Sequence, residues 1–373
     1  MVAEPDARVS TFELFFDLVF VFAITQITGT VTRAPTAVSL GRGVAVFLVL
    51  WWAWGAYAWL TNTVPTGETG PRLVVLAAMA AMLVIALAVP HAWGDGGVAL
   101  ALGFLAVMAL HCALFLLAAE NPTVARPAMI RLATTNLATA VILVGAGLAD
   151  GRAQTALWVA AIALCYAGPY LTGVAGFTVH PGHFVERHGL IVLIALGESV
   201  VAIGAGGDVT VDWGLAGVAL VVMALIVGLW WSYFDHDADD GERALVACEG
   251  PERARLARDV YSYLHIPLVL GVVYAAVGIH EALVRPNEPL DPVFAGAFAG
   301  GVVLYAAGLG AIRLRLGGRP HPARVAAALV AVAVIPLAPH VDAVVAAVIL
   351  AATTLAVALG DRPRARRMLE STA

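Results

Sequence analysis

Lysine is absent from this sequence, and charged residues of any kind make up only 13% of its 373 residues. A typical soluble domain carries about 25% charged residues, so this scarcity excludes an ordinary soluble fold. The few charges stand in short clusters between long apolar runs, and 61% of the residues are hydrophobic. An apolar run of roughly 20 residues crosses a bilayer as a helix, because a helix satisfies its own backbone hydrogen bonds.

Twelve such runs predict an all-α, polytopic transmembrane helical bundle. We expect spans at residues 12–30, 43–61, 72–90, 97–119, 128–148, 153–171, 187–206, 213–233, 260–283, 292–312, 323–338 and 341–360. The connection between the last two runs is short and contains Pro336 and Pro339. One interrupted helix is therefore the alternative for this pair.

Cysteine and metal-binding motifs are also scarce. The three cysteines show neither a disulfide framework nor zinc-ligand spacing, and no HExxH pair occurs, so no cofactor or metal is expected. The net charge of −5 is spread over the loops and gives a nucleic-acid partner no support. Membrane lipids and a small solute or ion are the expected partners, and the oligomeric state stays open.

Arginine supplies all the basic charge apart from histidine, and its positions predict the orientation. With both termini in the cytoplasm, most arginines fall inside and only Arg33, Arg42, Arg152 and Arg285 fall outside. Because short cytoplasmic loops are enriched in Arg and Lys, we expect an even number of spans with both ends inside.

The two halves of the chain look duplicated. Phe12-Glu13-Leu14 opens the first predicted span and Val185-Glu186-Arg187 the seventh, and a tryptophan pair follows in the next span of each half, at 51–52 and 230–231. We therefore expect six-helix repeats at 9–180 and 181–361, followed by a basic cytoplasmic tail at 362–373. Many transport folds place the substrate path between such repeats.

Intramembrane acids are the main candidates for function, since a carboxylate in mid-span costs roughly 2.5–3.5 kcal/mol to insert. Glu13 and Asp17 lie one turn apart on one face of the first span, with Thr28 on nearly the same face. Glu198, followed by Ser199, lies near the centre of the seventh span. The structural alternatives are a neutral, hydrogen-bonded Glu198 that joins helices and a Glu13 held at the headgroups by the helix dipole.

Two other groups of polar or aromatic residues are better interpreted as structural than as functional. Asp235, Asp237, Asp239 and Asp240 follow the eighth span and are expected to form a hydrated cytoplasmic surface. The tryptophans at 51, 52, 54 and 59 are expected to anchor the second span at the membrane interface.

The opening Glu13-Leu14-Phe15-Phe16-Asp17-Leu18-Val19-Phe20 resembles the first signature of the low-temperature-requirement A (LtrA) family of bacterial membrane proteins. Glu186-Arg187-His188-Gly189 with Leu196-Gly197-Glu198-Ser199 resembles the family's second signature, and Tyr263-Leu264-His265-Ile266-Pro267 its later His-Pro element. The resemblance covers most of the chain. Arg187, Glu186 and His265 are therefore expected to support the acids.

The first helix is also similar to the Phe-Ser-Asp motif of a non-canonical potassium-channel family, in which this helix lines the pore. The similarity places Asp17 and Thr25 near a path, with Phe20, Phe22 and Ile24 as a constriction. Phe16 replaces the family's serine here, and Phe22 replaces its constricting isoleucine.

Transport of a small solute or ion past Asp17 and Glu198, with proton coupling as an option, is the function that these features favour. A cation channel is a variant of this hypothesis. A membrane-embedded enzyme acting on a lipid through His111, His265 and Glu198 is an alternative from another class, although no nucleophile or metal motif supports it. A stress-related sensor or assembly protein is the third, and it predicts no need for a deep glutamate.

Overall fold

The computed structural model describes residues 8–64, 68–118, 122–174, 177–204, 212–235 and 237–360. Within these residues the regular structure is helical, as predicted. The chain divides into two compact units. Unit 1 contains the chain up to Ala34, Val38–Leu190 and Glu242–Tyr263, and unit 2 contains Pro35–Ala37, Ile191–Gly241 and the chain from Leu264.

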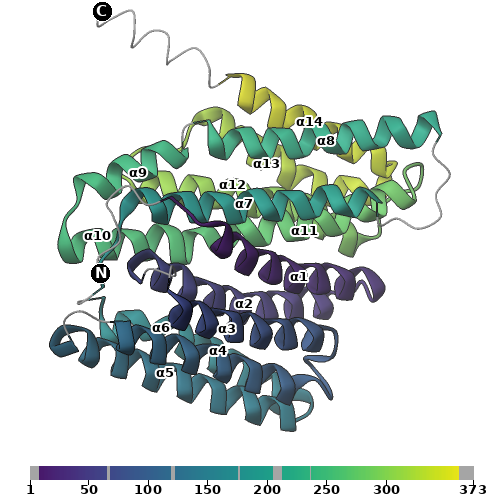
Figure 1. Ribbon diagram of the computed structural model, residues 1–373. Coiled ribbons are helices and arrows are strands. Elements are labelled where there is room, and N and C mark those ends of the chain that lie inside the picture. The colour runs from purple at the N-terminus through teal and green to yellow at the C-terminus, as the bar shows by residue number, and fades with distance from the viewer. Residues whose placement is uncertain are drawn as a thin grey trace, which may run out of the picture. The chain divides into compact units, whose positions relative to one another are not determined.

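Unit 1 is built from the first six long helices and two later pieces (Figure 1). Its elements are α1 (Thr11–Arg33), α2 (Ala37–Thr63), α3 (Thr69–Ala88), η1 (Val89–His91), α4 (Gly97–Ala118), α5 (Pro122–Leu148), α6 (Gly151–Thr172), the start of α7 (Pro181–Gly204), the end of α9 (Asp237–Ala247), α10 (Gly250–Ala257) and most of a π-helical segment, η2 (Arg258–Leu264). Helices α3 to α6 pack in chain order, and α1 packs against α3.

Unit 2 is a second helical bundle. It contains the rest of α7 and α9, α8 (Trp213–Phe234), α11 (His265–Val284), α12 (Pro292–Arg315), α13 (Pro322–Leu337), η3 (Ala338–His340) and α14 (Ala343–Gly360). Helix α12 packs against both α11 and α13, and α14 packs against α8. Helices α13 and α14 are separate and pack on each other, so the last two predicted spans are two helices.

Eleven helical segments in the described residues are long and apolar enough to cross a membrane. Helix α7 is not among them. Its 24 residues extend about 36 Å, which is enough to span, but it carries Glu186, Arg187 and Glu198. The chain is thus a multi-pass helical membrane protein.

Several helices begin earlier than predicted, among them α2 at Ala37 and α5 at Pro122. Helix α7 starts at Pro181 instead of residue 187, because proline without an N–H fits the first helical position. This start places His183, which precedes the predicted seventh span, on the helix itself. The predicted span 260–283 is the end of one continuous helical stretch, Gly250–Val284. The predicted end of the seventh span and the basic tail at 362–373 fall outside the described residues.

Candidate functional site

A buried ion cluster in unit 1 joins α1, α2 and α7, and Arg187 lies at its centre. The Arg187 side chain is 1% exposed. Its Nη1 donates to Glu13 Oε1 at 2.8 Å and to the Thr61 hydroxyl, and its Nη2 donates to Asp17 Oδ1 at 3.1 Å. One guanidinium therefore holds two carboxylates that stand one turn apart on α1, as their spacing led us to expect.

Glu13 is the more tightly held of the two acids. Ser10 caps α1, and its backbone N–H and hydroxyl both donate to Glu13 Oε2 at 2.9 Å, which forms a capping box. His183 Nε2 lies 3.1 Å from Glu13 Oε1. Both oxygens of Glu13 are thus occupied, and the side chain is 4% exposed. Glu13 lies in the first turn of α1, where its alternative interpretation placed it as a charge stabilised by the helix dipole, but it is buried in an ion cluster.

Asp17 is held on one side only. Its Oδ1 accepts from the Trp54 indole at 2.7 Å and from Arg187, while Oδ2 is buried without a hydrogen-bond partner in the described part of the chain. Arg187 Nε is likewise buried and unpaired there. Aromatic rings surround the pair: Phe16 stacks on Tyr57 at 4.9 Å between centroids, and the Arg187 guanidinium lies 5.9 Å from the Phe16 ring.

The charges of this cluster do not cancel. With both acids ionised, Glu13 and Asp17 carry two negative charges and Arg187 one positive charge, so these three residues together keep one net negative charge. A buried net charge is costly, and one added proton removes it. Asp17 is the acid in the cluster positioned to accept that proton, since both oxygens of Glu13 already accept charge-assisted or capping hydrogen bonds.

The other polar candidates on α1 divide between its two sides. Thr28 is buried, as are Phe20 and Ile24, and the Thr28 hydroxyl donates to the Ile24 carbonyl. Thr25 is half-buried and donates to the Val21 carbonyl at 3.1 Å. Phe22 is 37% exposed and lies on another side of the helix from Phe20 and Ile24. The three residues of the expected constriction therefore do not share one face.

The remaining candidates lie on or near α7 and in unit 2. Glu186 accepts a hydrogen bond from the Val9 backbone at 3.0 Å in unit 1. In unit 2, Glu198 is 6% exposed and Ser199 is also buried. His265 is buried as well, and its Nε2 lies 3.0 Å from the Tyr233 hydroxyl. Both of the deep acids, Asp17 and Glu198, are thus buried in their units.

Unit 2 contains a second ion cluster that sequence reasoning did not anticipate. Asp237, expected on a hydrated surface, is buried and bonded to Arg324, with Arg313 3.1 Å away. Arg324 also donates to the Ser232 carbonyl at 3.1 Å. The hydrated-surface prediction was wrong for Asp237, because an arginine on α13 approaches it from far along the chain.

Within the described residues, no group of three or more histidine, cysteine or acidic side chains gathers as a metal site.

Comparison with known proteins shows which family the chain is related to. The model of the family described as "Bacterial low temperature requirement A protein (LtrA)" matches residues 8–359. The chain belongs to this family. The resemblance drawn from the three short motifs is thereby confirmed.

A relative in Rhizobium meliloti (strain 1021), the uncharacterized protein RA0937, is 29% identical to this LtrA-family chain over 309 residues. The match covers 79% of the chain and 75% of the relative. Its printed name assigns no activity, so the chemistry has to be inferred from the site.

Several residues of the LtrA-family site were missed or misplaced by sequence reasoning. Thr61 and Trp54 were not candidates, and Trp54 was expected at the membrane interface together with Trp51. Both indoles are instead buried, and Trp54 bonds Asp17. One signal was available: Trp54 lies on a helix adjacent in sequence to an unpaired acid, and a buried indole N–H needs an acceptor.

Proposed function

We propose that this LtrA-family protein transports a small solute or ion across the bacterial inner membrane, coupled to a proton that binds the Glu13–Asp17–Arg187 cluster. The carrying observation is the uncompensated negative charge of this buried cluster, together with the free Oδ2 of Asp17. Buried acids in membrane spans are costly, and proton relays are one of their uses.

In this mechanism Asp17 is the proton-binding residue and Arg187 is the group that responds. While Asp17 is ionised, Arg187 holds both acids. Protonation of Asp17 weakens its bond to Arg187 Nη2, because a neutral carboxyl group is a poorer acceptor for a cation than a carboxylate. The guanidinium is then held by Glu13 and Thr61 and released from Asp17, so the local link between α1 and α7 changes with proton occupancy.

We also propose Glu198 and Ser199 as path residues of the second half, and six-helix repeats as the frame of both halves. The orientation proposed for this frame places both termini in the cytoplasm, following the arginine bias. A carrier is preferred to a channel, because a constriction by Phe20, Phe22 and Ile24 needs a shared face and Phe22 faces elsewhere.

The test is proton-coupled flux in proteoliposomes that contain the purified protein. An internal pH dye reports proton entry under an imposed pH gradient while monovalent cations are varied outside. We expect the proton flux of Asp17→Asn to be at least 10-fold lower than that of the wild type, because an amide has no acidic proton to exchange. The amide oxygen still accepts from Trp54, so the fold is expected to survive.

Glu68→Gln is the matched control, because Glu68 is an exposed carboxylate before α3 that makes no side-chain cap. It should leave the flux at the wild-type level. Glu198→Gln, measured in parallel, tests the second half. Wild-type flux in a well-folded Asp17→Asn protein would refute the proposed role of the cluster, and absence of flux in the wild type under every gradient would refute transport itself.

A further inference from the structure

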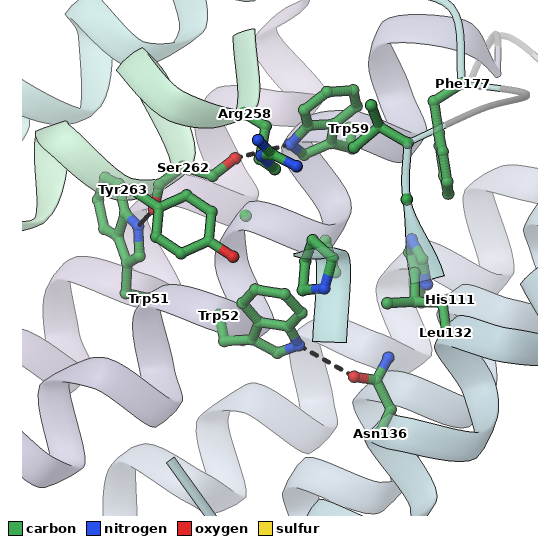
Figure 2. Close-up of a pocket in the computed structure, with 15 residues that line it drawn as sticks. Trp51, Trp52, Trp59, His111, Leu132, Asn136, Phe177, Arg258, Ser262 and Tyr263 are labelled. Carbon is green, nitrogen blue, oxygen red and sulfur yellow. Dashed lines mark hydrogen bonds between the residues drawn. The ribbon is translucent and has the colours of Figure 1, made fainter. Parts of the chain in front are cut away.

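Unit 1 also contains a cavity, separate from the ion cluster, that is lined by several aromatic side chains (Figure 2). It lies among α2, α4, α5, the end of α6 and the π-helical segment. Trp51, Trp52, Trp59, Phe177 and Tyr263 form much of its wall.

One wall residue presents an unused hydrogen-bond donor. Asn136 is 2% exposed, and its Oδ1 accepts from the Trp52 indole at 3.0 Å. An indole N–H can only donate, so the atom facing it must be the amide oxygen and the amide orientation is determined. The remaining atom, Nδ2, is buried without a partner in the described residues, and Figure 2 shows it on the side turned away from Trp52.

His111 supplies a second unused polar atom on the same cavity. Its ring is buried and packs edge-on to Tyr57 at 5.8 Å between centroids, and its Nδ1 has no partner in the described part of the chain. Buried polar atoms are costly to leave unpaired, each by roughly 1–3 kcal/mol. Both residues line the same apolar cavity, so a ligand bound there is a candidate partner for these two atoms.

The charged and hydroxyl groups on the wall are already engaged. Arg258 donates to Asp259 at 2.7 Å and lies 4.2 Å from the Tyr170 ring centroid. The Tyr263 hydroxyl donates to the Tyr166 carbonyl at 2.7 Å. Ser262 accepts the indole N–H groups of Trp51 and Trp59, through its carbonyl and hydroxyl respectively. The cavity therefore offers no free charge, which favours a neutral ligand.

We propose that this cavity binds a neutral, flat, lipid-soluble molecule with a ring carbonyl, of the quinone class. The carbonyl oxygen accepts from Asn136 Nδ2, and the ring packs between the aromatic side chains, where stacking adds about 0.5–1.5 kcal/mol for each ring pair. His111 Nδ1 lies on the same cavity for a second polar group of the ligand. Such a molecule reaches a transmembrane protein through the lipid. The proposal does not depend on the transport proposal.

The experiment titrates 2-methyl-1,4-naphthoquinone into the purified full-length protein and follows the saturable part of tryptophan fluorescence quenching. Trp51, Trp52 and Trp59 line the cavity and act as reporters. We expect saturable binding in the wild type and a dissociation constant at least 10-fold higher in Asn136→Leu. His111→Phe, which keeps the ring packing, should also bind more weakly.

Thr134→Val is the matched control, because Thr134 is on the same helix and its hydroxyl is exposed and bonded to the Ile130 carbonyl. It should bind as the wild type does. A second comparison uses 2-methylnaphthalene, which has the same ring shape without carbonyls, as a competitor, and we expect it to compete at least 10-fold more weakly. Absence of saturable binding, wild-type affinity in both Asn136→Leu and His111→Phe, or equal competition by the hydrocarbon would overturn the proposal.

Discussion

Arg187 shows how one residue decides what two others can do. Glu13 and Asp17 would repel each other across one turn of α1, and Arg187 turns this repulsion into a shared ion pair. Breaking a buried pair by removing one partner costs roughly 3–5 kcal/mol, because the charge left behind stays buried. Substitutions in this cluster can therefore measure the energetic coupling between residues on α1 and α7.

Arg187→Gln is expected to destabilise the protein strongly, by roughly 3–5 kcal/mol, because the two carboxylates remain buried without the cation that they share. Adding Glu13→Gln to this variant should recover part of the loss, so the two changes should be clearly non-additive. Thermal unfolding in detergent, followed by size-exclusion chromatography, measures both. Arg152→Gln, at an exposed arginine, is the control and should unfold like the wild type.

Additive effects of Arg187→Gln and Glu13→Gln on the stability of the protein would contradict this prediction. That result would mean that the two side chains do not share an interaction in the folded protein.

Helix packing in unit 2 depends on glycine at particular positions. Helices α11 and α12 approach so closely that a Cβ on Gly301 would lie 2.5 Å from both the Ala275 nitrogen and the Gly271 carbonyl oxygen. Gly300, its neighbour, has open space at the same position. Small residues allow this kind of backbone contact between membrane helices. The two adjacent glycines therefore have opposite structural roles.

Gly301→Ala should lower the melting temperature, because α11 and α12 must move apart to admit the methyl group. Gly300→Ala should leave it unchanged or raise it, since alanine favours a helix over glycine by about 1 kcal/mol. Thermal denaturation of both purified variants in the same detergent makes the comparison. Equal effects at the two positions would show that the close contact is absent in the protein.

The number of spans determines where the ends of the whole chain lie. In the part of the chain that the structure describes, eleven helical segments qualify as spans by length and apolar composition, and an odd number of spans would put the termini on opposite sides. If α7 also spans, the number is twelve and the ends share a side. The buried contacts of Arg187 explain how a helix with this much charge is tolerated in the membrane.

We expect both termini in the cytoplasm, so a fluorescent protein fused to either end should fluoresce and alkaline phosphatase fused to either end should stay inactive. A phosphatase fusion in the α6–α7 connection tests α7 itself and should also be inactive, since six spans precede it. Active phosphatase at one terminus alone would contradict a spanning α7.

The sequence by itself determined the membrane class, the helices and the family, because these depend on local composition and on short motifs within single helices. It also determined that Glu13 and Asp17 share a face, since the helical repeat relates residues four apart. The last pair of helices was left open by sequence and became two helices only in the structure.

Only the tertiary structure determined which side chains pair with one another. Arg187 is 170 residues or more from both acids, Trp54 is 37 residues from Asp17, and Arg324 is 87 residues from Asp237. No local rule relates such positions, because a side-chain contact depends on which helix faces lie together. The aromatic cavity likewise exists only where α2, α4, α5 and the π-helical segment meet, so its unused Asn136 donor had no signal in the sequence.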